Sequence, residues 1–241
     1  MLISPDSEKI EKTTSQAPLT APIAAYIAQG SKLVPIPKEL LLGIALADRY
    51  VCLIGPPGSG KSHILNKLHQ VTDLTPICTS SLIRKSFADS PKILEVMTSG
   101  RLVDDAPVIT LIRDEIQNSK DNPHGFVLDG FPRTVPQANW FSNFARCNNL
   151  PEPIILHLNL DEYTCQQRVE MRASAHNRPE DDLQVFKRRL HEYNLLSAPA
   201  VDILRNKGII IDVDCSGSKE QMWESATNGI IDKIIKTPYT L

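Results

Sequence analysis

The sequence predicts an α/β fold in which a parallel sheet lies between two layers of helices, and two observations predict it. Short apolar segments alternate with longer segments of helical periodicity from about residue 50 onward. One of the short segments, residues 154–160, has almost no polar side chain, as expected of a strand buried on both faces. Strand and helix in turn imply right-handed crossovers, with helices on both faces and ligands at the carboxyl ends of the strands.

The expected elements follow one another in a regular order. Residues 1–20 are polar and aperiodic and are expected to be a loose tail, and four prolines between residues 18 and 37 interrupt any long helix. Strands are expected at residues 50–55, 75–78, 125–128, 154–160 and 208–213. Helices are expected at residues 38–48, 61–71, 82–87, 92–98, 106–118, 135–147, 162–172, 181–205 and 219–235.

Composition argues against two classes of function. The formal charge of the 241-residue chain is −2, whereas a broad nucleic-acid-binding surface needs a basic excess. No apolar run approaches the ~20 residues of a membrane span, so no membrane contact is expected. The five cysteines form no C-x-x-C pair, which favours reduced, buried thiols. The amino-terminal residues match neither a secretory nor a transit pattern, so a cytoplasmic protein is expected.

The first motif is a phosphate loop at residues 55–62, between an expected strand and an expected helix. Its glycines let backbone N–H groups point at phosphate oxygens, and the helix that follows adds the positive end of its dipole. Lys61 would reach the β- and γ-phosphates, and Ser62 could approach Mg²⁺. The predicted ATP-binding residues of this loop are Gly55, Pro56, Pro57, Gly58, Ser59, Gly60, Lys61 and Ser62. The motif predicts a nucleotide site without specifying a kinase.

The second motif, Leu-Asp-Gly-Phe-Pro-Arg-Thr-Val-Pro-Gln at residues 128–137, follows an apolar strand. Asp129 at the strand's tip would hold a Mg²⁺-bound water, and Arg133 would grip a phosphate with its planar guanidinium. This motif resembles the signature of adenylate kinases, and the Gly-x-Pro-Gly-x-Gly-Lys form of the phosphate loop resembles them too. The likeness covers roughly residues 50–235.

The resemblance implies a P-loop NTPase fold and a role in nucleotide biosynthesis. The implied activity is direct transfer of the ATP γ-phosphate to AMP, with Mg²⁺ and without a covalent enzyme intermediate. The implied organisation is an extension at residues 1–48, partly flexible, and a kinase domain at residues 49–241. Within that domain, a helical acceptor lobe is expected at about residues 79–108 and a short lid at about residues 173–181. We expect a monomer.

The expected lobe matches the family in part. Residues 78–84 stand where the family has Ser-Thr-Gly-Asp-x-x-Arg, and residues 100–103 where it has Gly-Lys-Leu-Val. Ser80 and Ser81 replace the family's glycine and aspartate, which suggests weakened Mg²⁺ tuning and acceptor positioning. A nucleotide-binding protein with little activity is therefore one alternative. The implied AMP-binding residues are Thr79, Arg84, Val103, Gly130, Arg133 and Gln137.

The acceptor base is expected to be adenine. In the family, the residue four positions beyond the Phe-Pro-Arg arginine reads the base, and Gln137 resembles the adenine-reading enzymes. A glutamine can pair bidentately with adenine's donor and acceptor edge. Thr79 agrees, because the pyrimidine enzymes tend to have alanine there. The second alternative is a UMP/CMP kinase, which the short lid resembles.

Several arginines complete the expected site, because phosphoryl transfer is catalysed chiefly by positioning and electrostatic stabilisation. Arg168 and Arg172 are four residues apart on an expected helix and share a face. By resemblance, Arg168 lies against the ATP adenine, and Arg172, Arg178 and Arg189 lie on the phosphates. The predicted catalytic residues are Lys61, Asp129, Arg133, Arg172, Arg178 and Arg189. His63 stands where the family commonly has threonine, and the sequence offers no explanation for it.

Overall fold

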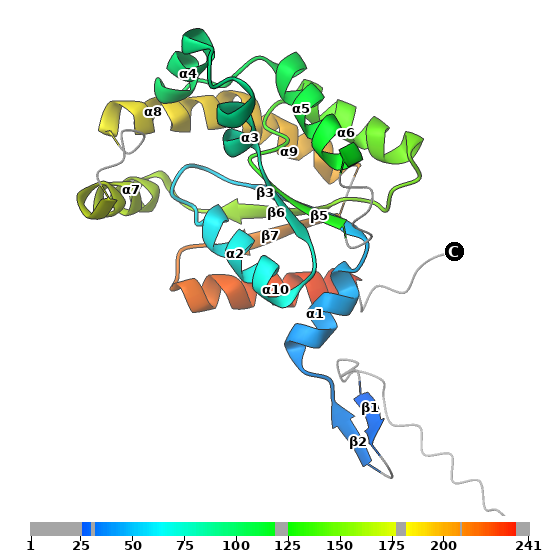
Figure 1. Ribbon diagram of the computed structural model, residues 1–241. Helices are drawn as coiled ribbons and strands as arrows, with labels where there is room; N and C mark the ends of the chain where they lie inside the picture. The colour runs from blue at the N-terminus through cyan, green and yellow to red at the C-terminus, as the bar shows by residue number, and fades with distance from the viewer. Residues whose placement is uncertain (1–25, 30–31, 119–124, 177–181, 208, 235–241) are drawn as a thin grey trace, which may run out of the picture.

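A five-stranded parallel sheet forms the centre of the molecule in the computed structural model, which describes residues 26–29, 32–118, 125–176, 182–207 and 209–234 (Figure 1). Its strand order is β4-β5-β3-β6-β7. The strands are β3 (Arg49–Ile54), β4 (Thr75–Cys78), β5 (Gly125–Asp129), β6 (Ile154–Asn159) and β7 (Ile209–Asp214). The predicted α/β fold with a parallel sheet is confirmed.

The strand order brings the two motifs together. The chain crosses from β3 over β5 to β4, and later from β5 over β3 to β6, so the order reverses beside β3. In the register, Leu53 of β3 lies opposite Asp129 of β5, and Asp129 also lies opposite Cys78 of β4. The phosphate loop, Asp129 and Thr79 therefore emerge at neighbouring carboxyl ends, at the switch point where ligands of such sheets bind.

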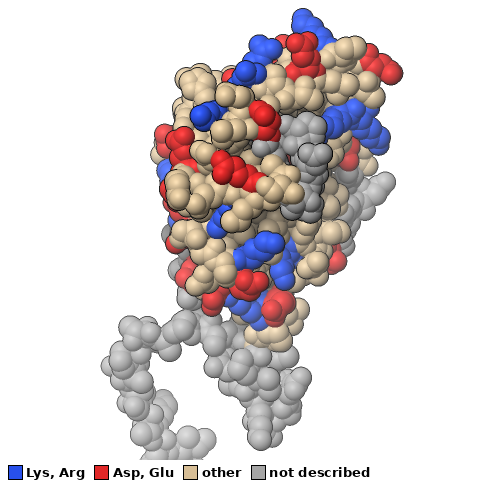
Figure 2. Space-filling model, turned by 90° about the vertical axis from the view of Figure 1, so that its left-hand side faces the viewer, with Lys and Arg blue, Asp and Glu red and all other residues tan. Residues whose placement is uncertain are grey.

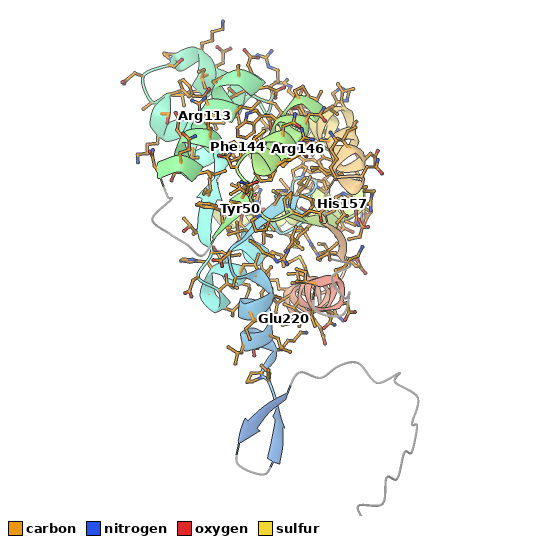
Figure 3. The ribbon with its side chains drawn as sticks, turned by 90° about the vertical axis from the view of Figure 1, so that its right-hand side faces the viewer. Tyr50, Arg113, Phe144, Arg146, His157 and Glu220 are labelled. Carbon is orange, nitrogen blue, oxygen red and sulfur yellow. The ribbon has the colours of Figure 1, made fainter. Side chains whose placement is uncertain are left out.

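Helices cover both faces of the sheet (Figure 1). One layer consists of α1 (Lys38–Leu46), α2 (Lys61–Val71) and α10 (Lys219–Ile234). The other face carries α3 (Thr79–Ser86), α5 (Asp105–Asn118), α6 (Val135–Cys147) and α9 (Ala198–Arg205), with α4 (Pro91–Thr98) beyond them. Figure 3 shows this arrangement from the side, with Arg113 and Phe144 in one helical layer and Glu220 in the other.

Burial explains why this sequence adopts these layers. Val51, Cys52 and Leu53 of β3 are all completely buried, with alternate residues contributing to the cores on the two faces. Burial of each large apolar side chain contributes about 1.5–3 kcal/mol. Thr134 caps α6, because its Oγ1 accepts a hydrogen bond from the Gln137 backbone N–H (3.2 Å). Such a cap contributes about 1 kcal/mol.

The long helix expected at residues 181–205 is divided in the structure. It consists of α8 (Leu183–Glu192), a wide π-type turn η2 (Tyr193–Ser197) and α9, while residue 181 lies outside the described part. Pro199 explains the wide turn, because proline lacks a backbone N–H and its ring collides with the carbonyl four residues earlier. Tyr193 Oη lies 3.0 Å from Nε2 of His157 on β6; Figure 3 labels this histidine.

In the amino-terminal part, the sequence predicted helix α1 but neither the hairpin before it nor the packing of α1 into the body of the molecule. A hairpin of β1 (Tyr26–Gln29) and β2 (Lys32–Pro35) lies apart from the layered body (Figure 1). Helix α1, in contrast, belongs to that body, since Leu42, Ala45 and Leu46 are buried in the core beneath the sheet. The domain boundary at residue 48 stays a prediction, and the packing of α1 favours placing it before residue 38.

The surface seen in Figure 2 carries acidic and basic side chains interspersed with one another. Helix α7 (Glu162–His176) and α8 pack together through a small core of their own at this side of the molecule. That core contains Cys165, Val169, Phe186 and Leu190. Among the residues described, no helix combines the length and apolarity that a membrane crossing requires.

Candidate nucleotide-binding site

A cavity of about 1000 Å³ opens at the carboxyl ends of β3, β4 and β5. Most of the site residues expected from the sequence line it: Gly55, Pro57, Gly58, Gly60, Lys61, Ser62, Thr79, Arg84, Val103, Asp129, Gly130, Arg133, Gln137, Arg168, Arg172 and Arg189. Ser59 is completely buried within the loop, and Pro56 lines a smaller pocket behind it. Arg178 and the rest of the lid from residue 177 to 181 lie outside the described residues.

The phosphate loop is drawn tightly around its own lysine. Lys61 Nζ donates hydrogen bonds to the carbonyl oxygens of Gly55 (2.7 Å) and Pro56 (2.9 Å). Gly60, just before α2, has a φ of +96°, and a Cβ there would lie 2.8 Å from Met222 Cε. A side chain at residue 60 would therefore be both strained and obstructed. The loop's shape thus depends on glycine, and α2 begins directly behind it.

Charges converge on Lys61. The pKa of its ammonium group is lowered to about 8, chiefly by burial; the charge of Asp129 opposes this shift, and the nearby cations Arg133 and Arg189 add to it. Burial also lowers the pKa of Arg133, against the stabilising charge of Asp129. Arginine remains protonated in proteins, so the cavity contains a concentrated positive charge beside the two acidic residues of its lining, Asp129 and Glu192. Such a site is suited to a polyanionic ligand.

Arg133 is held in place from two sides. Its Nε donates to the Gly130 carbonyl (2.9 Å), and its own carbonyl accepts a hydrogen bond from Ser197 Oγ of η2 (2.9 Å). Gly130 has a φ of +82°, and a Cβ on it would lie 3.1 Å from Arg133 Nε. The Asp-Gly pair of the motif therefore provides the turn that lets this arginine fold back over the end of β5.

The acceptor side of the cavity contains a buried polar network. Gln137 is 2% exposed, and its Oε1 accepts a hydrogen bond from the Arg133 backbone N–H (2.8 Å). Its Nε2 donates to Asp105 Oδ1 (2.8 Å), which also accepts from Thr134 Oγ1 (2.8 Å). Thr79 Oγ1 is buried at the cavity wall and has no hydrogen-bond partner among the described residues, as expected where a ligand supplies the partner.

The opposite end of the cavity combines the predicted Arg168 with a loop after β7 that the sequence did not predict as part of the site. Arg168 Nη2 donates to the carbonyl oxygens of Cys215 (2.7 Å) and Gly217 (3.1 Å), which ties α7 to the loop after β7. This loop contributes Gly217, Ser218 and Lys219 to the lining, together with His63 of α2. The sequence could have predicted this loop as part of the site, because it follows the carboxyl end of a strand, where ligands of such sheets bind. The buried Nε2 of His63 also has no partner in the described part of the chain.

Helix α8 contacts the segment that joins α4 to α5. Arg188 Nη1 donates to the Ser99 carbonyl (2.8 Å), and Glu192 Oε2 accepts from the Leu102 N–H (3.4 Å). These contacts place Arg189 over the cavity mouth. Ser80 lines the cavity, with its Oγ 3.3 Å from Cys78 Sγ, whereas Ser81 is exposed and outside the lining.

The loop at the switch point and the arginines that line the same cavity define the class: a P-loop protein. The sequence model of the family described as Adenylate kinase matches residues 53–209. This chain belongs to the adenylate kinase family, and the predicted P-loop NTPase fold is confirmed with it.

Similar proteins agree with this assignment. An adenylate kinase from Neurospora crassa is 32% identical over 204 residues, which cover 72% of this chain and 73% of the relative. An adenylate kinase from Nitrobacter hamburgensis is 34% identical over 172 residues, or 67% of this chain and 82% of the relative. One from Leptospira biflexa is 31% identical over 185 residues, or 75% of this chain and 97% of the relative.

Proposed function

We propose that this protein transfers the γ-phosphate of ATP to AMP and so forms two molecules of ADP. The observation that carries the proposal is that the phosphate loop and the acceptor segment 129–137 line one cavity, with Asp129 beside the loop. Two nucleotides bound there would meet between Lys61 and Arg133. The family assignment supports the same reaction.

The donor nucleotide would bind along the phosphate loop. Backbone N–H groups of residues 55–62 and the start of α2 would hold the triphosphate, with Lys61 on its β- and γ-phosphates. Arg168 would lie against the adenine, which the loop after β7 would border. Because Arg168 is already hydrogen-bonded to that loop, the proposed adenine pocket would need little rearrangement to bind ATP.

The residues present fit a phosphate-bound Mg²⁺. Asp129 and Ser62 both line the cavity and offer hard oxygen ligands, which Mg²⁺ prefers. Among the residues that the structure describes, no group of three His, Cys, Asp or Glu side chains could hold a metal ion. Asp129 and Ser62 would therefore hold the ion together with the phosphates and water. Bound Mg²⁺ would neutralise charge on the transferring phosphoryl group.

The acceptor would bind across the carboxyl ends of β4 and β5. Arg84 and Arg133 would hold the AMP phosphate, Gln137 would pair with the adenine, and the Thr79 hydroxyl would gain its missing partner. Val103 and Gly130 would contact the nucleoside. This arrangement uses every acceptor residue expected from the sequence. The proposed acceptor lobe is the one expected there, at about residues 79–108.

Transfer would be direct. An oxygen of the AMP phosphate forms a bond to the γ-phosphorus while the bond to the bridging β–γ oxygen breaks, and that oxygen leaves as part of ADP. Arg172, Arg178 and Arg189 would stabilise the charge spread over the transferring group. The short lid at about residues 173–181 would exclude water, which would otherwise hydrolyse ATP.

Two alternatives lead to different results in one assay. ADP formation is measured with ATP–Mg²⁺ and AMP, UMP, CMP or GMP offered separately, beside a control without acceptor. Turnover with AMP is the expected result. Turnover with UMP or CMP in its place would indicate a pyrimidine nucleotide kinase. Nucleotide binding without acceptor-dependent turnover would indicate a nucleotide-binding protein with little activity. Ser80 and Ser81 favour this alternative, because they replace the glycine and aspartate of the family.

The remaining expectations from the sequence concern organisation. We infer that the chain acts as a monomer in the cytoplasm, with the segment before α1 outside the catalytic body. Size-exclusion chromatography with light scattering tests the first, and activity of a chain beginning at residue 36 tests the last.

A further inference from the structure

Asp105 lies outside the cavity lining but touches the residue proposed to read the acceptor base. It is the first residue of α5, and its Oδ1 accepts two hydrogen bonds, one from Gln137 Nε2 and one from Thr134 Oγ1, both 2.8 Å long. Gln137 is almost completely buried, so each of its amide atoms needs a partner. Asp105 is one of these partners.

The two partners of the Gln137 amide fix which way round it lies. The Arg133 backbone N–H can only donate, and it donates to Oε1 (2.8 Å). The Asp105 carboxylate can only accept, and it accepts from Nε2 (2.8 Å). If the amide turned over, an N–H group would face an N–H group and a carbonyl oxygen would face a carboxylate. Both contacts would be repulsive, so the flip is opposed twice.

The fixed orientation leaves a defined pattern towards the cavity. After these two hydrogen bonds, the amide retains one N–H on Nε2 and one lone pair on Oε1. That pair matches adenine, whose N6 amino group donates and whose N1 accepts. Hypoxanthine presents the reverse order, with O6 accepting and N1–H donating, and would require the flipped amide.

We propose that Asp105 is a positioning residue that sets the orientation of the Gln137 amide and thereby makes the acceptor site select AMP over IMP. This inference rests on the proposed function and adds the basis of its base selectivity. The same two hydrogen bonds also join α5 to α6, so a purely structural role of Asp105 is the competing explanation.

Kinetics with AMP and IMP as acceptors separate the two explanations. A well-formed bidentate base contact contributes about 1–3 kcal/mol of discrimination, which is roughly 5- to 150-fold. In Asp105→Leu the AMP-to-IMP ratio of kcat/KM is expected to fall by about 10-fold, through the acceptor KM, with the KM for ATP unchanged. Asp105→Asn keeps an oxygen that accepts from Nε2 and is expected to restore most of the ratio. Asp104→Asn removes the charge of the neighbouring exposed carboxylate, keeps a side chain that can cap α5, and is the matched control.

Each outcome decides between the explanations. A wild-type protein that does not phosphorylate AMP would refute the proposed function itself. A second outcome separates the function from the role of Asp105. If the wild type selects AMP, but Asp105→Leu has a lower melting temperature and kcat/KM falls equally for AMP and IMP, the proposed function stands. The positioning role of Asp105 is then overturned. If Asp105→Leu does not fold, Asp105→Ser repeats the comparison, since serine keeps a small polar side chain at the start of α5 but is too short to reach the Gln137 amide.

Discussion

The two halves of the cavity are organised differently. On the acceptor side, Gln137, Asp105 and Thr134 hydrogen-bond to one another, so the groups proposed to read the base have a fixed orientation. On the donor side, the groups that would hold ATP are mostly backbone N–H groups and the charge of Lys61. From this difference we expect selectivity to reside in the acceptor half, and the donor half to recognise a triphosphate through charge and loop shape.

The largest expected effect removes charge from the donor half. In Lys61→Ala the phosphate loop loses its only lysine. We expect kcat to fall by about 10²–10³-fold or more, because a preorganised group that stabilises the transition state has that value. Coupled ADP formation measures the loss, and Lys67→Ala on the same helix is the matched control. Near-normal turnover of Lys61→Ala would show that the phosphate loop is misassigned.

Gln137→Leu tests the acceptor half. The KM for AMP is expected to rise by roughly 5- to 150-fold with little change in the KM for ATP. The variant should also lose about 1–3 kcal/mol of stability, since the Arg133 N–H would lose its partner and Asp105 would keep only the hydrogen bond from Thr134. Steady-state kinetics and urea unfolding measure the two effects. Equal increases in both KM values would mean that the halves are not separate.

The pH dependence sharpens the description of the donor half. In the free enzyme the pKa of Lys61 is lowered to about 8, chiefly by burial. Its side chain is therefore positively charged below pH 8 and loses this charge as the pH rises above 8. We expect kcat/KM for ATP to decline as the pH rises through about 8, by up to tenfold per pH unit. Bound triphosphate favours the charged form, so kcat should decline only at higher pH. A kcat/KM that stays level to pH 9.5 contradicts this.

The smallest expected effect concerns His63. Burial, with the nearby Lys219 and Lys67 charges, lowers its pKa below the ordinary value, against a hydrogen bond to the Lys219 backbone and the charge of Glu220. The unfolded chain therefore binds the proton first as pH falls below about 6.5, so this stabilisation is complete above pH 6.5 and is lost at lower pH.

Thermal unfolding between pH 5.5 and 7.5 measures this contribution. His63→Asn should show a shallower decline of melting temperature at acidic pH than the wild type. His69→Asn, which removes an exposed histidine of the same helix, is the matched control. Equal slopes for the wild type and His63→Asn would remove His63 as a source of acid sensitivity.

The sequence predicted the sheet and most of the cavity because both depend on local patterns. The phosphate loop and residues 128–137 are contiguous motifs that follow strands, and parallel strands bring their carboxyl ends to one edge. The Asp105–Gln137 hydrogen bond joins residues 32 apart, so no local pattern contains it. The hairpin of β1 and β2 was missed because prolines flank it, and they argue against a helix without indicating a strand pair.

The wide turn η2 makes the chain sensitive to length at that place. Each residue of a helix turns the next by about 100°, so the extra residue of a π-type turn sets the rotation between α8 and α9. Arg189 and Glu192 face the cavity, while Ala200 and Leu204 are buried against the sheet. A one-residue deletion in η2 would rotate α8 relative to α9. Either the cavity-facing residues of α8 or the buried residues of α9 would then point in the wrong direction, even though none of them had been substituted. Between Tyr193 and Ser197, the number of residues matters as much as their identity.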